Sequence, residues 1–212
     1  FDAPKVPIPN SLVPKYRDKI STQASFGNIL HDLSRGNSAL ASRIITTSPD
    51  VSVSTNLGPW VNQRGVFSLD VRNDVFRDEK VASAQKWLRH GGGQHMELGI
   101  AESNLFTMLA ALGLSGPIFG TRLLPVGTLY DPFIARGLDA LNYACYQDAR
   151  FMLVATPAGI TLAPEGGAHQ SVSTPLIGMG QPGLISFEPA YADELATIMK
   201  WGFEYMQADD GG

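Results

Sequence analysis

Short apolar runs that alternate with helical patterns fill the second half of the chain, and this alternation constrains the fold more than any other feature. Phe151 to Ala155 is a continuous apolar run of strand length, which is typical of a strand buried on both faces. The pattern predicts strands at residues 96–100, 118–126, 151–155 and 183–187, and helices at residues 103–114, 132–146 and 192–206. We therefore predict an α/β fold, a three-layer sandwich whose mostly parallel central sheet is covered by helices on both faces.

The first half of the chain shows the same alternation less regularly. Apolar residues at helical spacing predict a helix over residues 20–33, and a β-branched run predicts a strand at residues 43–47. The segment 63–93 is mixed, and within it residues 75–88 have room for a helix.

The ends of the chain suggest how it is organised into domains. Residues 1–19 are predicted to be an arm or linker, because four prolines lie between Asp2 and Pro14 with no periodicity. Residues 20–212 then form one domain. The chain starts at Phe1 without a methionine and stops in a polar loop, so we expect it to be a fragment of a longer enzyme.

Composition disfavours several partners and compartments. Sixteen Lys and Arg against twenty Asp and Glu give a net charge of −4, which disfavours nucleic acid as a partner. No run approaches the roughly 18 apolar residues of a membrane helix, so no membrane association is expected. The single cysteine, Cys145, excludes an internal disulfide and fits a reducing compartment. Because the start lacks the pattern of a signal peptide, we expect the cytoplasm.

Four loops at predicted strand ends carry the residues of interest. They are residues 48–50, 99–102, 127–133 and 164–170. Functional residues of parallel sheets gather at the carboxyl ends of the strands, so we expect these loops to face one cleft.

Two of these loops carry candidates for proton transfer. Glu102 begins an apolar helix, where a carboxylate can simply stabilise the helix dipole. Its apolar neighbours instead favour a raised pKa and an acid–base role. His169 follows three small residues that let another molecule approach its ring, although it also suits a plain surface loop. Glu165, four residues earlier, either orients His169 or is solvated.

The other two loops carry candidates for ligand contact. Tyr130 and Phe133 have the geometry to stack on a flat heteroaromatic ring, or they belong to the core. Asp50 follows its strand as a turn residue often does. No metal site is expected, because the four histidines lack the spacing of a metal motif and have no cysteine partners.

With these loops in hand, residues 20–206 resemble the pyrimidine-binding domain of transketolase-like thiamine diphosphate enzymes, most closely the homodimeric pyruvate dehydrogenase decarboxylating component. Residues 99–104 (GIAESN) match the segment whose glutamate hydrogen-bonds the aminopyrimidine ring of the cofactor. The resemblance implies that Glu102 has this role. It also implies that Glu102 drives the tautomer whose nitrogen deprotonates the thiazolium carbon, while the cofactor supplies the carbanion chemistry.

The remaining loops extend the resemblance. Residues 164–170 (PEGGAHQ) are similar to the loop that ends in a catalytic histidine, which implies catalytic roles for His169 and for Glu165. Asp50 resembles the aspartate of the first strand-end loop, but Val51 stands where pyruvate dehydrogenases have a glutamate. Tyr130 and Phe133 lie one residue away from the family's ring-packing positions, and the resemblance implies that they contact the cofactor. The spacing of residues 136–150 favours the pyruvate dehydrogenase branch.

One family motif is absent, and its absence shapes the predicted partners. The Gly-Asp-Gly motif and the following Asn-Asn, which bind diphosphate and Mg²⁺ in this family, do not occur in the 212 residues. The resemblance therefore implies that a diphosphate-binding domain of a second subunit holds Mg²⁺, that the enzyme is a homodimer, and that this chain alone is inactive.

The implied function is half of the active site of a thiamine diphosphate-dependent pyruvate dehydrogenase. Such an enzyme decarboxylates a 2-oxo acid and transfers the acyl group to lipoamide, with a lipoyl acyltransferase core as a further partner. Two alternatives stay open: a transketolase that moves a two-carbon ketol unit between sugar phosphates, and a non-catalytic regulatory or assembly domain.

Overall fold

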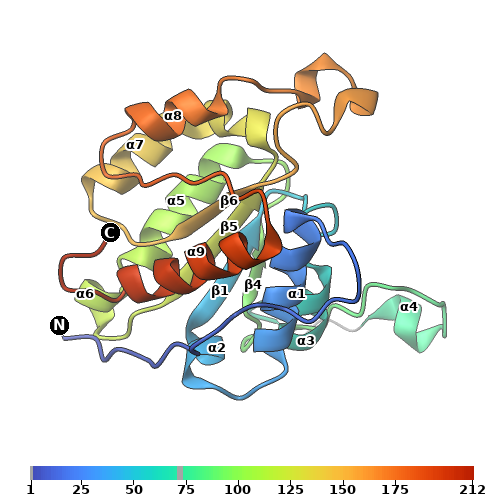
Figure 1. Cartoon of the computed structure of the whole chain (residues 1–212). Coiled ribbons are helices and arrows are strands. Elements are labelled where there is room, and N and C mark those ends of the chain that lie inside the picture. Colours follow the sequence, from blue (N-terminus) through green and yellow to red (C-terminus); the bar gives the residue numbers. More distant parts are fainter. Residues whose placement is uncertain (1, 71–73) are drawn as a thin grey trace.

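A parallel sheet forms the centre of the molecule (Figure 1). The computed structural model describes residues 2–70 and 74–212, and in them six strands run in the order β3-β2-β4-β1-β5-β6. Every strand pairing in this sheet is parallel. The strands are β1 (Ile44–Ser48), β2 (Val66–Phe67), β3 (Arg89–His90), β4 (His95–Glu97), β5 (Leu124–Leu129) and β6 (Met152–Ala155).

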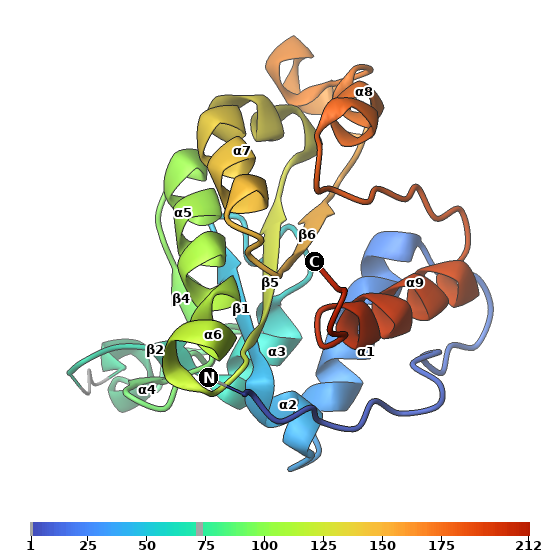
Figure 2. The same ribbon diagram turned by 90° about the vertical axis from the view of Figure 1, so that its left-hand side faces the viewer.

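Helices cover both faces of the sheet (Figure 2), which confirms the predicted three-layer α/β sandwich. One face carries α5 (Glu102–Gly113) and α7 (Leu138–Tyr146), which pack on each other. The opposite face carries α1 (Thr22–Ser34), α3 (Gly58–Arg64) and α9 (Ala192–Tyr205), with α1 in contact with both of the others. The shorter elements are α2 (Ala39–Arg43), α4 (Val75–Asp78), α6 (Ser115–Phe119), α8 (Thr174–Gly180), and the 3-10 turns η1 (Asp131–Gly137), η2 (Ala163–Glu165) and η3 (Gly167–His169).

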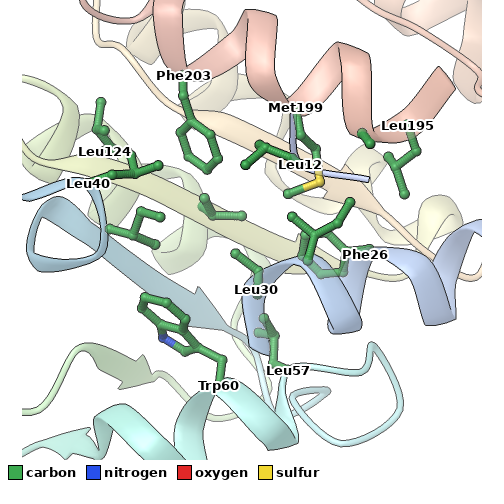
Figure 3. Packing of buried hydrophobic residues seen from close by; sticks show 14 of the residues in the cluster. Leu12, Phe26, Leu30, Leu40, Leu57, Trp60, Leu124, Leu195, Met199 and Phe203 are labelled. Carbon is green, nitrogen blue, oxygen red and sulfur yellow. The ribbon is translucent and has the colours of Figure 1, made fainter. Parts of the chain in front are cut away.

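The larger core lies between the sheet and the layer of α1, α3 and α9 (Figure 3). Phe26, Trp60 and Phe203 are its largest fully buried side chains, one from each of these helices. Burial of each such side chain contributes roughly 1.5–3 kcal/mol. The N-terminal segment joins this core through Leu12, and its Val6 exchanges two hydrogen bonds with the Gln207 amide.

A second core joins α5 and α7 to the other face of the sheet. It contains Leu105, Phe106 and Leu109 of α5, together with Leu129 of β5 and Leu141 of α7. Gly127 of β5 is required here, because a Cβ at that position would stand 2.6 Å from the Leu109 side chain. The close approach of α5 to β5 fixes the start of α5 relative to the ends of the strands.

Several predicted elements differ from the structure. The helix predicted at 132–146 is divided, because residues 131–137 form the 3-10 turn η1 and α7 starts only at Leu138. The strand predicted at 183–187 is absent: these residues form an extended segment without strand pairing, and Ile185 and Phe187 are about half exposed. The strand predicted at 118–126 starts too early, because α6 runs to Phe119 and Gly120 then takes a left-handed conformation. Within residues 75–88, helix α4 ends at Asp78, and Lys80 has a positive φ of 57° that an α-helix cannot continue.

The helices of the described residues can also be compared, in length and apolar character, with what a membrane-spanning helix requires. None of them is long and apolar enough to span a membrane.

Candidate functional site

The carboxyl ends of four parallel strands meet at one edge of the sheet. Strand β1 ends at Ser48, β4 at Glu97, β5 at Leu129 and β6 at Ala155. The predicted loops 48–50, 99–102 and 127–133 therefore lie at this edge. The loop 164–170 is separated from β6 by residues 156–163, and it returns to the same edge through η2 and η3.

A buried hydrogen-bonded network holds the backbone of the Asp50 loop. The Asp50 N–H donates to Glu97 Oε1 at 2.8 Å, and the Ser52 hydroxyl donates to Glu97 Oε2 at 2.7 Å. The His95 ring lies between Ser52 Oγ, 3.0 Å from Nε2, and Thr46 Oγ1, 2.9 Å from Nδ1. Asp50 itself is exposed and has a positive φ of 65°, a left-handed conformation that Asp adopts more readily than most residues and that the hydrogen bond to its N–H supports.

The carboxyl group of Glu97 responds to this environment. Burial alone would raise the pKa of Glu97, but hydrogen bonds from His95, Ser52 and the Asp50 N–H outweigh it and lower the pKa below the ordinary value of 4.5. Glu97 is therefore an ionised acceptor that organises the loop.

Two further contacts tie the loop after β1 to the end of β5. The Tyr130 hydroxyl donates to Ser54 Oγ at 2.7 Å, and the Thr55 and Thr128 hydroxyls lie 2.9 Å apart. These two contacts join the loop that contains Asp50 to the segment that contains Tyr130.

The rings of Tyr130, Phe133 and His169 form a cluster. The centroid of the His169 ring lies 5.3 Å from that of Phe133 and 6.1 Å from that of Tyr130, edge-on to both. Tyr130 and Phe133 are 5.9 Å apart. His169 Nε2 lies 3.6 Å from a carboxylate oxygen of Glu165, whereas His169 Nδ1 is buried without a hydrogen-bond partner. The structure thus brings together four residues that the sequence singled out from two separate loops.

Glu102 lies at the first turn of α5 with its side chain 9% exposed. Its Oε1 accepts a hydrogen bond from Arg136 Nη1 at 2.7 Å, an ion pair that the sequence reasoning did not include. The Arg136 guanidinium carbon also lies 3.7 Å from the centroid of the Phe133 ring. Glu102 is therefore linked through Arg136 to Phe133, and through Phe133 to His169.

A glycine makes this arrangement possible. A Cβ on Gly137 would stand 2.3 Å from the Phe106 ring of α5 and 3.2 Å from the Glu102 carbonyl oxygen. Because position 137 has no side chain, η1 packs directly on the first turn of α5, which carries the neighbouring Arg136 to Glu102.

Asp131 anchors the other end of η1. It is 4% exposed, and its Oδ2 accepts the Gly159 N–H at 2.8 Å. Oδ1 is buried without a partner. This carboxylate joins the segment after β6, which leads to His169, to the loop that carries Tyr130 and Phe133.

Sequence reasoning missed Arg136, Glu97 and Asp131. Arg136 follows Phe133 by three residues, and this spacing can place two side chains on one face of a helical turn, but it does not by itself indicate the contact with Glu102. Glu97 and Asp131 had only their positions at strand ends as a signal. Asp50, which was predicted, contacts this cluster only through its loop.

Across residues 2–70 and 74–212, no group of three or more His, Cys, Asp or Glu side chains could hold a metal ion. Cys145 lies in the second core, where burial raises the pKa of its thiol.

The chain is similar in sequence to a family of known proteins. The family model described as the pyruvate dehydrogenase E1 component middle domain matches residues 13–212. The pyruvate dehydrogenase E1 component of Mycolicibacterium smegmatis is 26% identical over 193 residues, covering 90% of this chain and 20% of that protein. The Escherichia coli protein of the same name is 25% identical over 204 residues, covering 94% of this chain and 22% of the relative. The chain thus spans about a fifth of the length of these relatives.

Solved structures give the same picture of the fold. A transketolase from Campylobacter jejuni superposes with a TM-score of 0.70 at 17% identity, covering 92% of this chain and 26% of that one. A transketolase from Leishmania mexicana gives a TM-score of 0.71 at 21% identity, with the same coverage. At these identities the likeness establishes a shared fold.

Proposed function

The chain belongs to the family of pyruvate dehydrogenase E1 component middle domains, and from that premise we propose that it forms the pyrimidine-binding half of a thiamine diphosphate-dependent active site. One observation carries this proposal. A buried carboxylate, Glu102, and an aromatic ring, Phe133, are bridged by a flat nitrogen-bearing group, the Arg136 guanidinium. The two residues therefore fit a flat nitrogen heterocycle such as an aminopyrimidine, stacked on the ring and hydrogen-bonded to the carboxylate.

Under this proposal, different residues of the chain would bind the cofactor ring, transfer protons and face the substrate. When bound, thiamine diphosphate supplies the carbanion chemistry. Glu102 would hold a proton shared with a ring nitrogen of the pyrimidine, and Phe133 and Tyr130 would position the ring. His169, with Glu165 beside it, would face the substrate and move a proton to or from it. Asp50 would lie at the edge of the same site, on a backbone that Glu97 fixes.

The reaction and the partners are part of the same proposal. The relatives' name, pyruvate dehydrogenase E1 component, supports pyruvate as the substrate. The proposal extends this to decarboxylation of pyruvate and transfer of the acyl group to lipoamide, which would require a lipoyl acyltransferase core. A diphosphate-binding domain from a second subunit would complete the site and hold Mg²⁺. In that arrangement the enzyme is a homodimer, and the 212-residue chain alone is inactive.

The test uses the full-length enzyme that contains this domain, with thiamine diphosphate and Mg²⁺. We expect pyruvate-dependent reduction of ferricyanide, and we expect Glu102→Gln to lower it on the order of a thousandfold, because the amide cannot take up the proton. Glu79→Gln, at an exposed position directly after α4, is the matched control and should leave the rate unchanged.

Two results would overturn parts of the proposal. Turnover of xylulose 5-phosphate and ribose 5-phosphate without turnover of pyruvate would make the enzyme a transketolase. A folded enzyme that binds no thiamine diphosphate, and whose function survives Glu102→Gln, would make this domain a regulatory or assembly module.

A further inference from the structure

The segment that carries Glu165 and His169 leaves the body of the molecule after β6 and returns to it before α8. This His169 segment, residues 160–170, projects beyond the end of β6 (Figure 1), and all of its residues are at least partly exposed. Its backbone hydrogen bonds are local, each spanning three residues, such as the one from the His169 N–H to the Gly166 carbonyl at 3.1 Å. These bonds shape the segment, but they do not fix it to the sheet.

The His169 segment is closed at a narrow neck, formed by the residues on either side of it. The Ser171 N–H donates to the Gly159 carbonyl at 3.0 Å, which joins the two sides. The Gly159 N–H in turn donates to Asp131 Oδ2 at 2.8 Å. Asp131 is 4% exposed and directly follows the end of β5, so the neck is held by a buried carboxylate at the edge of the sheet.

A second link connects Asp131 to the other side of the neck. Thr174, the first residue of α8, has its hydroxyl 2.8 Å from that of Ser171, and it donates to the Asp131 carbonyl oxygen at 3.4 Å. Because a hydroxyl carries one hydrogen, the Ser171 hydroxyl must then donate to Thr174. The hydrogen bonds form a closed ring in which Asp131 holds Gly159 with its carboxylate and Ser171 with its backbone.

The chain neighbours of Asp131 contact the far end of the same segment. The rings of Tyr130 and Phe133 lie 6.1 Å and 5.3 Å from the His169 ring, centroid to centroid. Residues 130–133 therefore hold the His169 segment at two points, through ring contacts at the imidazole and through Asp131 at the neck. A shift of the neck would move the imidazole relative to both rings.

From this arrangement we propose that Asp131 is a positioning residue of the active site, which fastens the neck of the His169 segment and so sets where the His169 ring lies. The inference rests on the proposed function, because it takes His169 as the group that moves a proton. Proton transfer requires hydrogen-bond reach, and a small displacement of the transferring group slows it. Asp131 touches neither substrate nor cofactor in this role, and it acts through His169.

The experiment measures pyruvate-dependent ferricyanide reduction and cofactor affinity in the full-length enzyme with thiamine diphosphate and Mg²⁺. We expect Asp131→Ala to lower kcat about tenfold and to leave the dissociation constant of the cofactor unchanged, because the carboxylate serves only the histidine. Asp131→Asn keeps an acceptor oxygen for the Gly159 N–H and should recover most of the rate. Asp32→Ala, at an exposed position of α1, is the matched control and should behave as the wild type does.

A double-variant cycle separates positioning from a merely structural role. In the His169→Ala enzyme, Asp131→Ala should cause no further loss of kcat, because the two residues act as one unit. A structural role would instead multiply the two losses. Thr174→Val opens the other link of the ring and repeats the cycle if Asp131→Ala does not fold. We expect it to lower kcat about threefold, and only when His169 is present. Thr197→Val on α9 is its exposed control.

Hydrogen exchange gives a readout that does not depend on turnover. Amides of residues 158–172 should exchange about tenfold faster in Asp131→Ala, while those of α9 stay as in the wild type. Unchanged exchange at the neck would overturn the inference.

The outcomes distinguish this inference from the proposed function. If His169→Ala slows turnover but Asp131→Ala and Thr174→Val do not, the positioning role is wrong and the proposed function holds. Multiplied losses in the double variant, or a loss of cofactor affinity as large as the loss of kcat, also overturn the positioning role. A wild-type enzyme without thiamine diphosphate-dependent turnover would overturn both.

Discussion

Two histidine–glutamate pairs lie at the carboxyl edge of the sheet, and they differ mainly in burial. His95 Nε2 and Glu97 Oε2 are 3.4 Å apart, with side chains 0% and 19% exposed. His169 Nε2 and Glu165 Oε2 are 3.6 Å apart, with side chains 30% and 50% exposed. The chemical groups and the distances are nearly the same in both pairs, so their surroundings decide what each pair does.

The buried pair is surrounded by hydrogen bonds, and the exposed pair is not. Thr46, Ser52 and the Asp50 N–H form hydrogen bonds with the first pair, so its polar atoms already have partners within the protein. His169 is held by ring contacts with Tyr130 and Phe133, and its Nδ1 has no hydrogen-bond partner. The comparison teaches that the first pair shapes the loop, whereas the second keeps the freedom that a proton-transfer group requires.

The largest expected effect is on the buried pair. Glu97→Leu should lower the free energy of unfolding by about 3 kcal/mol, because His95, Ser52 and the Asp50 N–H lose their shared acceptor in a buried place. Urea denaturation measures this. A loss below about 1 kcal/mol would mean that the network does not hold the loop.

For the exposed pair we expect a functional effect instead. His169→Ala in the full-length enzyme should slow turnover on the order of a hundredfold while cofactor affinity stays nearly intact, because the residue would serve the reacting substrate. Steady-state kinetics and cofactor titration separate the two quantities. Equal losses of both would assign His169 a structural role like that of His95.

Acid should distinguish the pairs as well. The pKa of Glu97 is lowered in the folded state, so the unfolded state binds more protons as the pH falls below about 4.5. The stabilisation from Glu97 is present above that pH and is lost as the pH falls through the lowered pKa. Urea unfolding between pH 6 and pH 3 should therefore show a steeper loss in the wild type than in Glu97→Gln. Parallel curves would contradict this.

The smallest effect is expected for Glu165→Leu. The Glu165 side chain is half exposed and its pair with His169 is open to solvent, so the free energy of unfolding should change by less than about 0.5 kcal/mol. Denaturation beside Glu97→Leu makes the contrast direct. A cost that approaches that of Glu97→Leu would remove the distinction between the two pairs.

Elements with strong periodicity were predictable from the sequence. The helix predicted at 103–114 is α5, at Glu102–Gly113, and the strand predicted at 151–155 is β6, at Met152–Ala155. Residues 183–187 also contain three large apolar side chains, although Gly183 and Ser186 interrupt the run, and they pair with no strand in the described sheet. Periodicity identifies a segment that is able to form a strand, and pairing depends on distant neighbours that local sequence does not contain.

The candidate site was also predictable only in part, because some of its contacts depend on distant parts of the chain. Strand-end position selected Glu102, Tyr130 and Phe133, because parallel strands bring their ends together. His169 lies beyond residues 156–163, which follow β6, and the small residues before it were the signal that selected it. Arg136 was missed because a charged residue in a helical run is usually solvated. Its contacts depend on the fit of η1 against α5, which only the folded chain reveals.

The contact of Gly137 with Phe106 has an evolutionary consequence. A side chain at position 137 has no room while position 106 is an aromatic ring. Lineages that descend from a common ancestor should therefore change the two positions together, with a larger residue at 137 tolerated only where 106 has become small. Substitutions at this pair would shift the position of Arg136 relative to Glu102 without changing Arg136 or Glu102 themselves.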